Sequence, residues 1–95
     1  MHILFIGRDK PGAVSVRLAN RPAHLAYLAD NAETIRIAGP YLDEATGEPR
    51  GSMLIVEAEN LEAARALLAK DPYAAADLFA EIEILPWRWV VGLPG

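Results

Sequence analysis

The chain pairs an imidazole with a carboxylate at the margins of two segments that have helical character. His24 lies on the border of the first segment, and Asp71 stands directly before Pro72, where the second segment ends. A histidine that a carboxylate orients can carry a proton at neutral pH without a metal or a cofactor. The sequence therefore predicts an acid–base pair, on the condition that folding brings His24 and Asp71 together beside a cavity.

Each of the two residues also has a purely structural interpretation. Directly before a proline, Asp71 is well suited to cap a short helical turn whose first position is Pro72. His24 can simply form a hydrogen bond at the edge of its helix. The two roles of Asp71 are compatible, because one carboxylate oxygen can cap while the other accepts from the imidazole and fixes its tautomer. Both interpretations stay open at this point.

Other polar residues are candidates for binding a substrate. Ser52 could donate to a substrate oxygen or satisfy a strand end, and no Gly-x-Ser-x-Gly turn marks it as a nucleophile. Arg21 could hold an anionic substrate with its planar guanidinium or remain a solvated charge. Gly39 and Pro40 either let the backbone approach a ligand or form a plain turn. Tyr73 could line the pocket with its hydroxyl as a polar group.

The composition restricts the class of partner. The 95 residues suit a single domain, 1–95, and 53% of them are hydrophobic, above the usual share of about 45–50%. The net charge of −4 argues against nucleic acid, since the few basic residues, such as Arg17, Arg21 and Arg88, are too scattered to bind a phosphate backbone. The sequence therefore predicts no nucleic-acid partner, and the excess of apolar residues favours a partner subunit that covers them.

Motifs for metals, cofactors and membranes are not found in the sequence. The chain has no cysteine, its two histidines lack metal-ligand spacing, and no glycine-rich phosphate loop occurs. No signal peptide precedes the apolar segment 2–6, and no apolar run approaches the roughly 20 residues of a membrane span. The sequence predicts a cytoplasmic protein that uses neither metal nor cofactor and does not enter a membrane.

Hydrophobic periodicity predicts the elements that position these residues. Residues 2–6 form a strand that is apolar on both faces, followed by a polar connection over 9–12. Residues 13–32 have helical spacing, and Pro22 is expected to divide them into a short opening turn and a main helix. The predicted apolar stripe of that helix, about a quarter-turn from His24, consists of Leu18, Leu25, Leu28, Ala29 and Ala32.

The second half of the chain repeats the pattern of strands and a helix. Strands are expected over 34–38, closing at Gly39-Pro40, over 52–57, and from about residue 80, with a loop over 43–51. Asn60 should cap a helix over 61–70, and one more helical turn is expected within 72–78. This order predicts a ferredoxin-like βαββαβ fold of the α+β class, an antiparallel four-stranded sheet with two helices on one face.

The sheet face without helices is expected to be buried in a homodimer. Strands 2–6 and 52–57 are apolar on both sides, so two sheets packed face to face would exclude water from the second side. Pro86 places the last strand at a sheet edge or a bulge. Trp87 and Trp89 point to one side of an extended strand and are interpreted as anchors of the dimer interface.

Four short motifs then resemble one family. Arg21-Pro22-Ala23-His24-Leu25, Ala38-Gly39-Pro40, Gly51-Ser52 and Asp71-Pro72-Tyr73, in this order, resemble the YciI-like (YCII-related) proteins over essentially the whole chain. The resemblance implies a dimeric α+β barrel, related in fold to muconolactone isomerase, with a His–Asp pair in a pocket. It implies that His24 is the family histidine, that Asp71 is the family aspartate, and that Ser52 lies near them.

The combined prediction is a cofactor-independent acid–base enzyme of the isomerase or lyase type that acts on a small organic molecule. His24 would move the proton and Asp71 would orient it. Two alternatives remain at this stage. One is a non-catalytic module that binds a small metabolite in the same pocket, and the other is a structural dimerisation domain without a working pocket.

Overall fold

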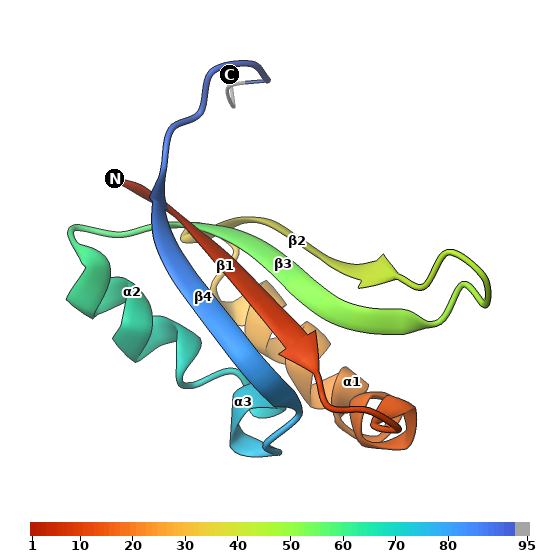
Figure 1. Ribbon diagram of the computed structural model, residues 1–95. Coiled ribbons are helices and arrows are strands. Elements are labelled where there is room, and N and C mark those ends of the chain that lie inside the picture. The colour runs from red at the N-terminus through yellow and green to blue at the C-terminus, as the bar shows by residue number, and fades with distance from the viewer. Residues whose placement is uncertain (93–95) are drawn as a thin grey trace.

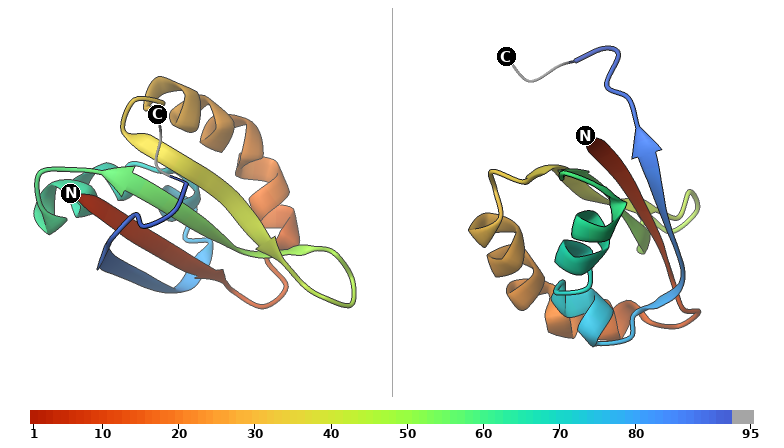
Figure 2. Two further views of the ribbon diagram at one scale, coloured as in Figure 1. Left: turned by 90° about the horizontal axis from the view of Figure 1, so that it is seen from above. Right: turned by 90° about the vertical axis from the view of Figure 1, so that its left-hand side faces the viewer.

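The computed structural model describes residues 1–92 and contains one antiparallel sheet with helices packed on one of its faces (Figures 1 and 2). The sheet order is β2-β3-β1-β4. This arrangement confirms the predicted ferredoxin-like α+β class, the protomer fold of dimeric α+β barrels. The elements in chain order are β1 (His2–Asp9), α1 (Val14–Asp30), β2 (Ile35–Leu42), β3 (Pro49–Glu57), α2 (Leu61–Leu68), α3 (Pro72–Ala75) and β4 (Phe79–Trp87).

Helix α1 runs without a break through Pro22, so the predicted division at this proline was wrong. A proline inside a helix removes one hydrogen bond and costs about 3 kcal/mol. Here Pro22 and Leu18, whose carbonyl loses its donor, are both exposed, so water can satisfy that carbonyl. Arg17 and His24 are buried on either side of the proline and hold the helix against the rest of the protein. Tertiary contacts therefore outweigh the local cost.

The buried side of α1 also differs from the predicted apolar stripe. Leu18 and Leu25 are 58% and 49% exposed, whereas the buried residues of the helix are Arg17, His24 and Tyr27. These three residues also follow helical spacing and share one face. Polar and aromatic side chains of α1 are buried because they form hydrogen bonds and stacking contacts in the interior. A prediction from hydrophobicity alone therefore assigns the wrong face of α1 to the core.

The strands are longer than predicted where prolines were expected to end them. Strand β2 continues through Gly39 and Pro40 to Leu42, and β3 already begins at Pro49. Since β2 is an edge strand, the missing N–H of Pro40 is tolerated. The same reason accounts for Pro86 inside β4, whose predicted edge position is confirmed by the strand order.

Both predicted helix caps in the second half are present. The side chain of Asn60 accepts a hydrogen bond from the backbone N–H of Ala63 and begins α2. Asp71 accepts from the backbone N–H of Tyr73 and begins α3, the short additional turn expected after Pro72. Because α3 follows α2 almost directly and packs against α1, the carboxylate that caps it is placed beside α1.

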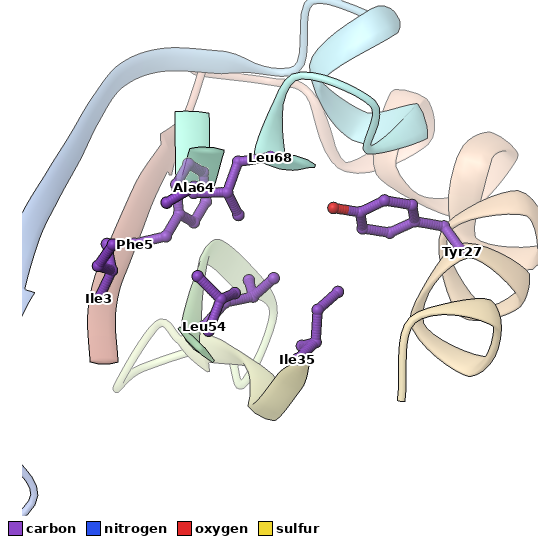
Figure 3. Packing of buried hydrophobic residues seen from close by; sticks show 8 residues of the cluster. Ile3, Phe5, Tyr27, Ile35, Leu54, Ala64 and Leu68 are labelled. Atoms are coloured by element: carbon purple, nitrogen blue, oxygen red, sulfur yellow. The ribbon is translucent and has the colours of Figure 1, made fainter. Parts of the chain in front are cut away.

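The main core lies between the sheet and the helices, and Tyr27 joins α1 to it (Figure 3). The Tyr27 hydroxyl donates to the carbonyl oxygen of Leu67 at 2.8 Å, which ties α1 to α2. Within residues 1–92, no helix has the length and apolar character needed to cross a membrane. The buried residues of the cluster are Ile3, Phe5, Tyr27, Ile35, Leu54, Val56, Ala64 and Leu68.

Burial gives Tyr27 a measurable effect on stability at alkaline pH. Loss of hydration, with a further contribution from the charge of Asp71, raises the pKa of Tyr27 to about 12 from the ordinary 10.0. Between these values the folded state holds a proton that the unfolded state releases, so stability decreases as pH rises. We expect Tyr27 to account for a loss of up to about 2 to 3 kcal/mol over this window.

Urea unfolding of the wild type and of Tyr27→Phe at a series of pH values from neutral to about 11.5 measures this contribution. The free energy of unfolding of the wild type should fall more steeply above the ordinary tyrosine pKa, near pH 10, than that of the phenylalanine variant. Equal slopes for the two proteins would contradict the assignment to Tyr27.

Candidate active site

The structure brings His24 and Asp71 into contact. His24 projects from α1, and its Nδ1 lies 2.8 Å from Oδ1 of Asp71 at the start of α3. The two residues are 47 positions apart in the sequence and are only 8% and 3% exposed. A carboxylate accepts hydrogen bonds, so Nδ1 carries the proton and Nε2 is the basic atom of the neutral ring.

One oxygen of Asp71 serves both of its bonds. Oδ1 accepts from Nδ1 of His24 and, at 2.9 Å, from the backbone N–H of Tyr73. The prediction that the cap and the imidazole use different oxygens was therefore wrong, because Oδ1 accepts both bonds. Because the cap fixes Oδ1 at the helix start, it also fixes the atom that orients His24.

Tyr73 forms the second contact of the imidazole. Its ring stacks on the ring of His24 with centroids 3.9 Å apart and an angle of 15° between the planes. The guanidinium carbon of Arg17 lies 4.7 Å from the centroid of the same ring. Burial raises the pKa of Tyr73 above its ordinary value, and the charge of Arg17 offsets only part of this effect. Tyr73 is therefore an uncharged phenol at neutral pH.

A second buried cluster lies around Arg17, and sequence reasoning did not identify it. Asp9, at the end of β1, accepts from Nε and Nη2 of Arg17 at 2.7 and 2.8 Å, and Nη2 also donates to Oγ of Ser52 at 2.9 Å. Burial lowers the pKa of Arg17, but the bond to Asp9 and its charge raise it more, so the net shift is upward. The guanidinium stays charged.

One signal in the sequence could have indicated the role of Arg17. It precedes His24 by seven residues, which is two helical turns, so the two side chains share one face of α1. Asp9 offered no comparable signal, because a carboxylate in a polar connection is usually solvated.

The predicted site residues surround one cavity of about 260 Å³ between α1, β2 and β3, which we call the site cavity. Asp71 lies behind His24 and does not line it. Apolar side chains, among them Leu25, Leu28 and Leu54, form much of the remaining wall. The predicted residues that line the cavity are Arg21, His24, Gly39, Pro40, Ser52 and Tyr73, and Arg17 joins them.

One other hollow of the described chain is larger but almost uncharged. This hollow, of about 430 Å³ beside α2 and β4, is larger than the site cavity, but Arg65 is its only charged lining residue and it contains no titratable pair. Among residues 1–92, no three histidine, cysteine or carboxylate side chains lie close enough together to bind a metal ion.

The fold and the site cavity define an α+β barrel protomer in which a helix and the sheet enclose a buried histidine–carboxylate pair. The chain belongs to the YCII-related domain family, whose sequence model matches residues 1–88. This match confirms the family suggested by the four motifs. Protein YciI of Escherichia coli is 34% identical over 97 residues, covering 95% of this chain and 99% of that protein. An uncharacterized protein of Haemophilus influenzae is 32% identical with the same coverage.

Solved structures show the same protomer. The 5-chloro-2-hydroxyhydroquinone dehydrochlorinase of Burkholderia phenoliruptrix, in complex with 2,5-dihydroxybenzoquinone, is 37% identical with a TM-score of 0.87, over 93% of this chain and 94% of that chain. The cofactor-independent oxygenase SnoaB of Streptomyces nogalater has a TM-score of 0.64 at 16% identity, over 95% and 96% of the two chains. The second likeness concerns the fold alone.

Proposed function

We propose that this protein is a cofactor-independent acid–base enzyme of the lyase or isomerase type, with His24 as the base and Asp71 as its orienting partner. The observation that carries the proposal is the 2.8 Å contact between Nδ1 of His24 and Oδ1 of Asp71, which leaves Nε2 of a cavity-lining imidazole for a substrate. A small-molecule substrate agrees with the size of the site cavity and with its apolar walls.

The proposed reaction is a proton transfer that the pair can perform alone. Nε2 of His24 takes a proton from the substrate, and the carboxylate of Asp71 stabilises the imidazolium that forms. In an elimination from the keto tautomer of a hydroxylated ring, Nε2 takes the proton of an O–H or saturated C–H bond, and the electrons of that bond form a double bond. The leaving group departs from a saturated ring carbon with the electrons of its own bond. In an isomerisation, the imidazolium returns the proton to a different carbon.

Elimination from a hydroxylated ring is the reaction to test first. The dehydrochlorinase described above shares 37% of its residues and the fold with this chain, and its name describes the loss of hydrogen and chlorine from a chlorinated hydroxyhydroquinone. The test is chloride release from that compound by the purified protein. Saturable binding without product would support the alternative of a metabolite-binding module.

A cytoplasmic location is also part of the proposal.

The proposed assembly is a homodimer that buries the open face of the sheet. Along β1 and β3, residues alternate between the helix-covered core and this face, which carries apolar side chains from all four strands. The ring of Trp87, the last residue of β4, contacts the ring of Trp89 with centroids 5.2 Å apart. Beyond Trp87 the chain leaves the sheet (Figures 1 and 2). The apolar residues of the open face are Leu4, Ile6, Ile37, Met53, Ile55 and Leu85.

A charge on the open face should separate the dimer. Leu85, 45% exposed in the protomer, would be covered by the partner, so Leu85→Glu should convert a dimer into a monomer. Sedimentation equilibrium measures the mass of both proteins. Ala66→Glu, which places the same charge on the exposed surface of α2, serves as the control and should remain dimeric. A monomeric wild type would refute the proposed assembly.

A further inference from the structure

The hydroxyl of Ser52 is a buried donor whose proton has no protein acceptor within residues 1–92. Its oxygen already accepts from Nη2 of Arg17 at 2.9 Å, and a guanidinium cannot accept in return. Ser52 is 2% exposed and lines the site cavity. Buried hydroxyl groups are normally satisfied, so an available O–H at a cavity wall indicates a group that a ligand completes.

The ion pair behind Ser52 holds this donor in place. Asp9 accepts from two nitrogens of Arg17, and both side chains are almost completely buried, at 7% and 5% exposure. A bidentate pair of this kind fixes the plane of the guanidinium. Arg17 therefore donates to the oxygen of Ser52 and leaves its O–H proton free. The positive charge of Arg17 also polarises this O–H and makes it a stronger donor.

The charges that reach the site cavity are all of one sign. The charged side chains that line it are Arg17 and Arg21, and His24 lines it as a neutral ring. No carboxylate lines it, because Asp9 and Asp71 lie behind Arg17 and His24. Arg21 forms no ion pair with any of residues 1–92. The whole chain carries a net charge of −4, so this lining opposes the overall charge. An anion is complementary to such a cavity.

We propose that the site cavity recognises an ionised hydroxyl of a single ring, a phenolate or an enolate, whose oxygen accepts a hydrogen bond from Ser52. Arg17 and Asp9 act as positioning residues for that donor. The inference rests on the proposed function, since it names the substrate class for the same site.

The walls and the volume support a ring. Leu25, Leu28 and Leu54 line the cavity and offer apolar surface to a ring face. The volume of about 260 Å³ exceeds the roughly 150 Å³ in which an apolar cavity holds benzene, and it leaves room for a few substituents. A free phosphate or another small inorganic anion would leave these apolar walls uncovered.

Binding of 4-nitrophenol tests the inference without requiring turnover. The phenolate and the phenol absorb at different wavelengths, so one titration gives the affinity and the ionisation state of the bound ring. The wild type should bind the phenolate at least about tenfold more tightly than the phenol, and should bind 4-nitroanisole, whose oxygen cannot ionise, more weakly still. Ser52→Ala should reduce phenolate affinity about tenfold or more, the usual effect of one hydrogen bond to a charged group.

Two controls separate binding from folding. Met53→Leu changes the neighbouring residue of β3, which faces the opposite side of the sheet, and should keep the wild-type affinity. Ser52→Thr retains a hydroxyl and should keep the preference for the phenolate. Thermal unfolding of each variant establishes that it is folded before binding is measured.

Several results would overturn the inference. They are equal affinity of the wild type for 4-nitrophenol and 4-nitroanisole, no binding of the phenolate, or unchanged phenolate affinity in Ser52→Ala. These results do not depend on the role of His24 in turnover. Loss of phenolate preference in Ser52→Ala would support the inference even if His24 proved dispensable, and the proposed function would then fail alone.

Discussion

Turnover of a hydroxylated ring substrate should fall by about 100- to 10,000-fold when His24 is replaced by alanine, the range that general base catalysis contributes. The substitution removes Nε2, the proposed proton acceptor, and leaves the carboxylate of Asp71 in place as the cap of α3. We expect the loss in kcat, because the base acts in the proton transfer step. Chloride release under saturating substrate measures it.

The other histidine of the chain provides a matched control. His2 lies on β1, near Glu57 and the ring of Trp89, and does not line the site cavity. His2→Ala removes the same side chain and should leave kcat within about twofold of the wild type, since it lies outside the reacting groups. Asp71→Asn should give an intermediate loss, because an amide oxygen can still cap α3 but carries no charge to stabilise the imidazolium. Unchanged kcat in His24→Ala would remove the proposed base.

The largest effect on stability should come from breaking the ion pair between Asp9 and Arg17. Arg17→Met keeps an unbranched side chain of similar reach but leaves the carboxylate of Asp9 buried without its partner. Removal of one member of a buried pair typically costs about 3–5 kcal/mol. Urea unfolding at neutral pH should show a loss of this size in the free energy of unfolding. The native hydrogen bond to Ser52 is lost as well.

Two further variants test the reason for that loss. Combining Arg17→Met with Asp9→Asn should cost less than the sum of the two single changes, because no unpaired charge remains buried. Lys10→Met breaks the exposed pair with Asp77 and should change stability by no more than about 1 kcal/mol. If Arg17→Met lowered the free energy of unfolding no more than Lys10→Met does, burial would not be the reason that the Asp9–Arg17 pair stabilises the protein.

Local signals and the family resemblance together allowed much of the fold, and the candidate site residues other than Asp9 and Arg17, to be predicted from the sequence. Asn60, Asp71 and Pro72 mark the ends of helices through their own backbone preferences, and these act within a few residues. The contact between His24 and Asp71 depends on the packing of α1 against α3, which local signals do not predict. The four motifs suggested it through the family resemblance.

The remaining features depend on tertiary partners that no local pattern reveals. The predicted buried face of α1 was its stripe of leucines and alanines. Arg17 and His24 lie on the face that is buried instead, because Asp9 and Asp71 neutralise or orient them. Pro22 was predicted to divide the helix because proline disfavours a helix interior, but the buried contacts of Arg17 and His24 keep α1 continuous. A buried arginine is unfavourable without its carboxylate, and the partner of Arg17 comes from a different element, at the end of β1.

The sharing of a single oxygen by the start of α3 and by the imidazole constrains how this protein can change. Serine or threonine at position 71 would begin the short helix about as well as aspartate does. Neither could hold the ring of His24 as a charged acceptor does, so variants chosen for thermal resistance alone could retain the architecture while losing the proposed reactivity. Selection for turnover, in contrast, would preserve both properties at once through Asp71.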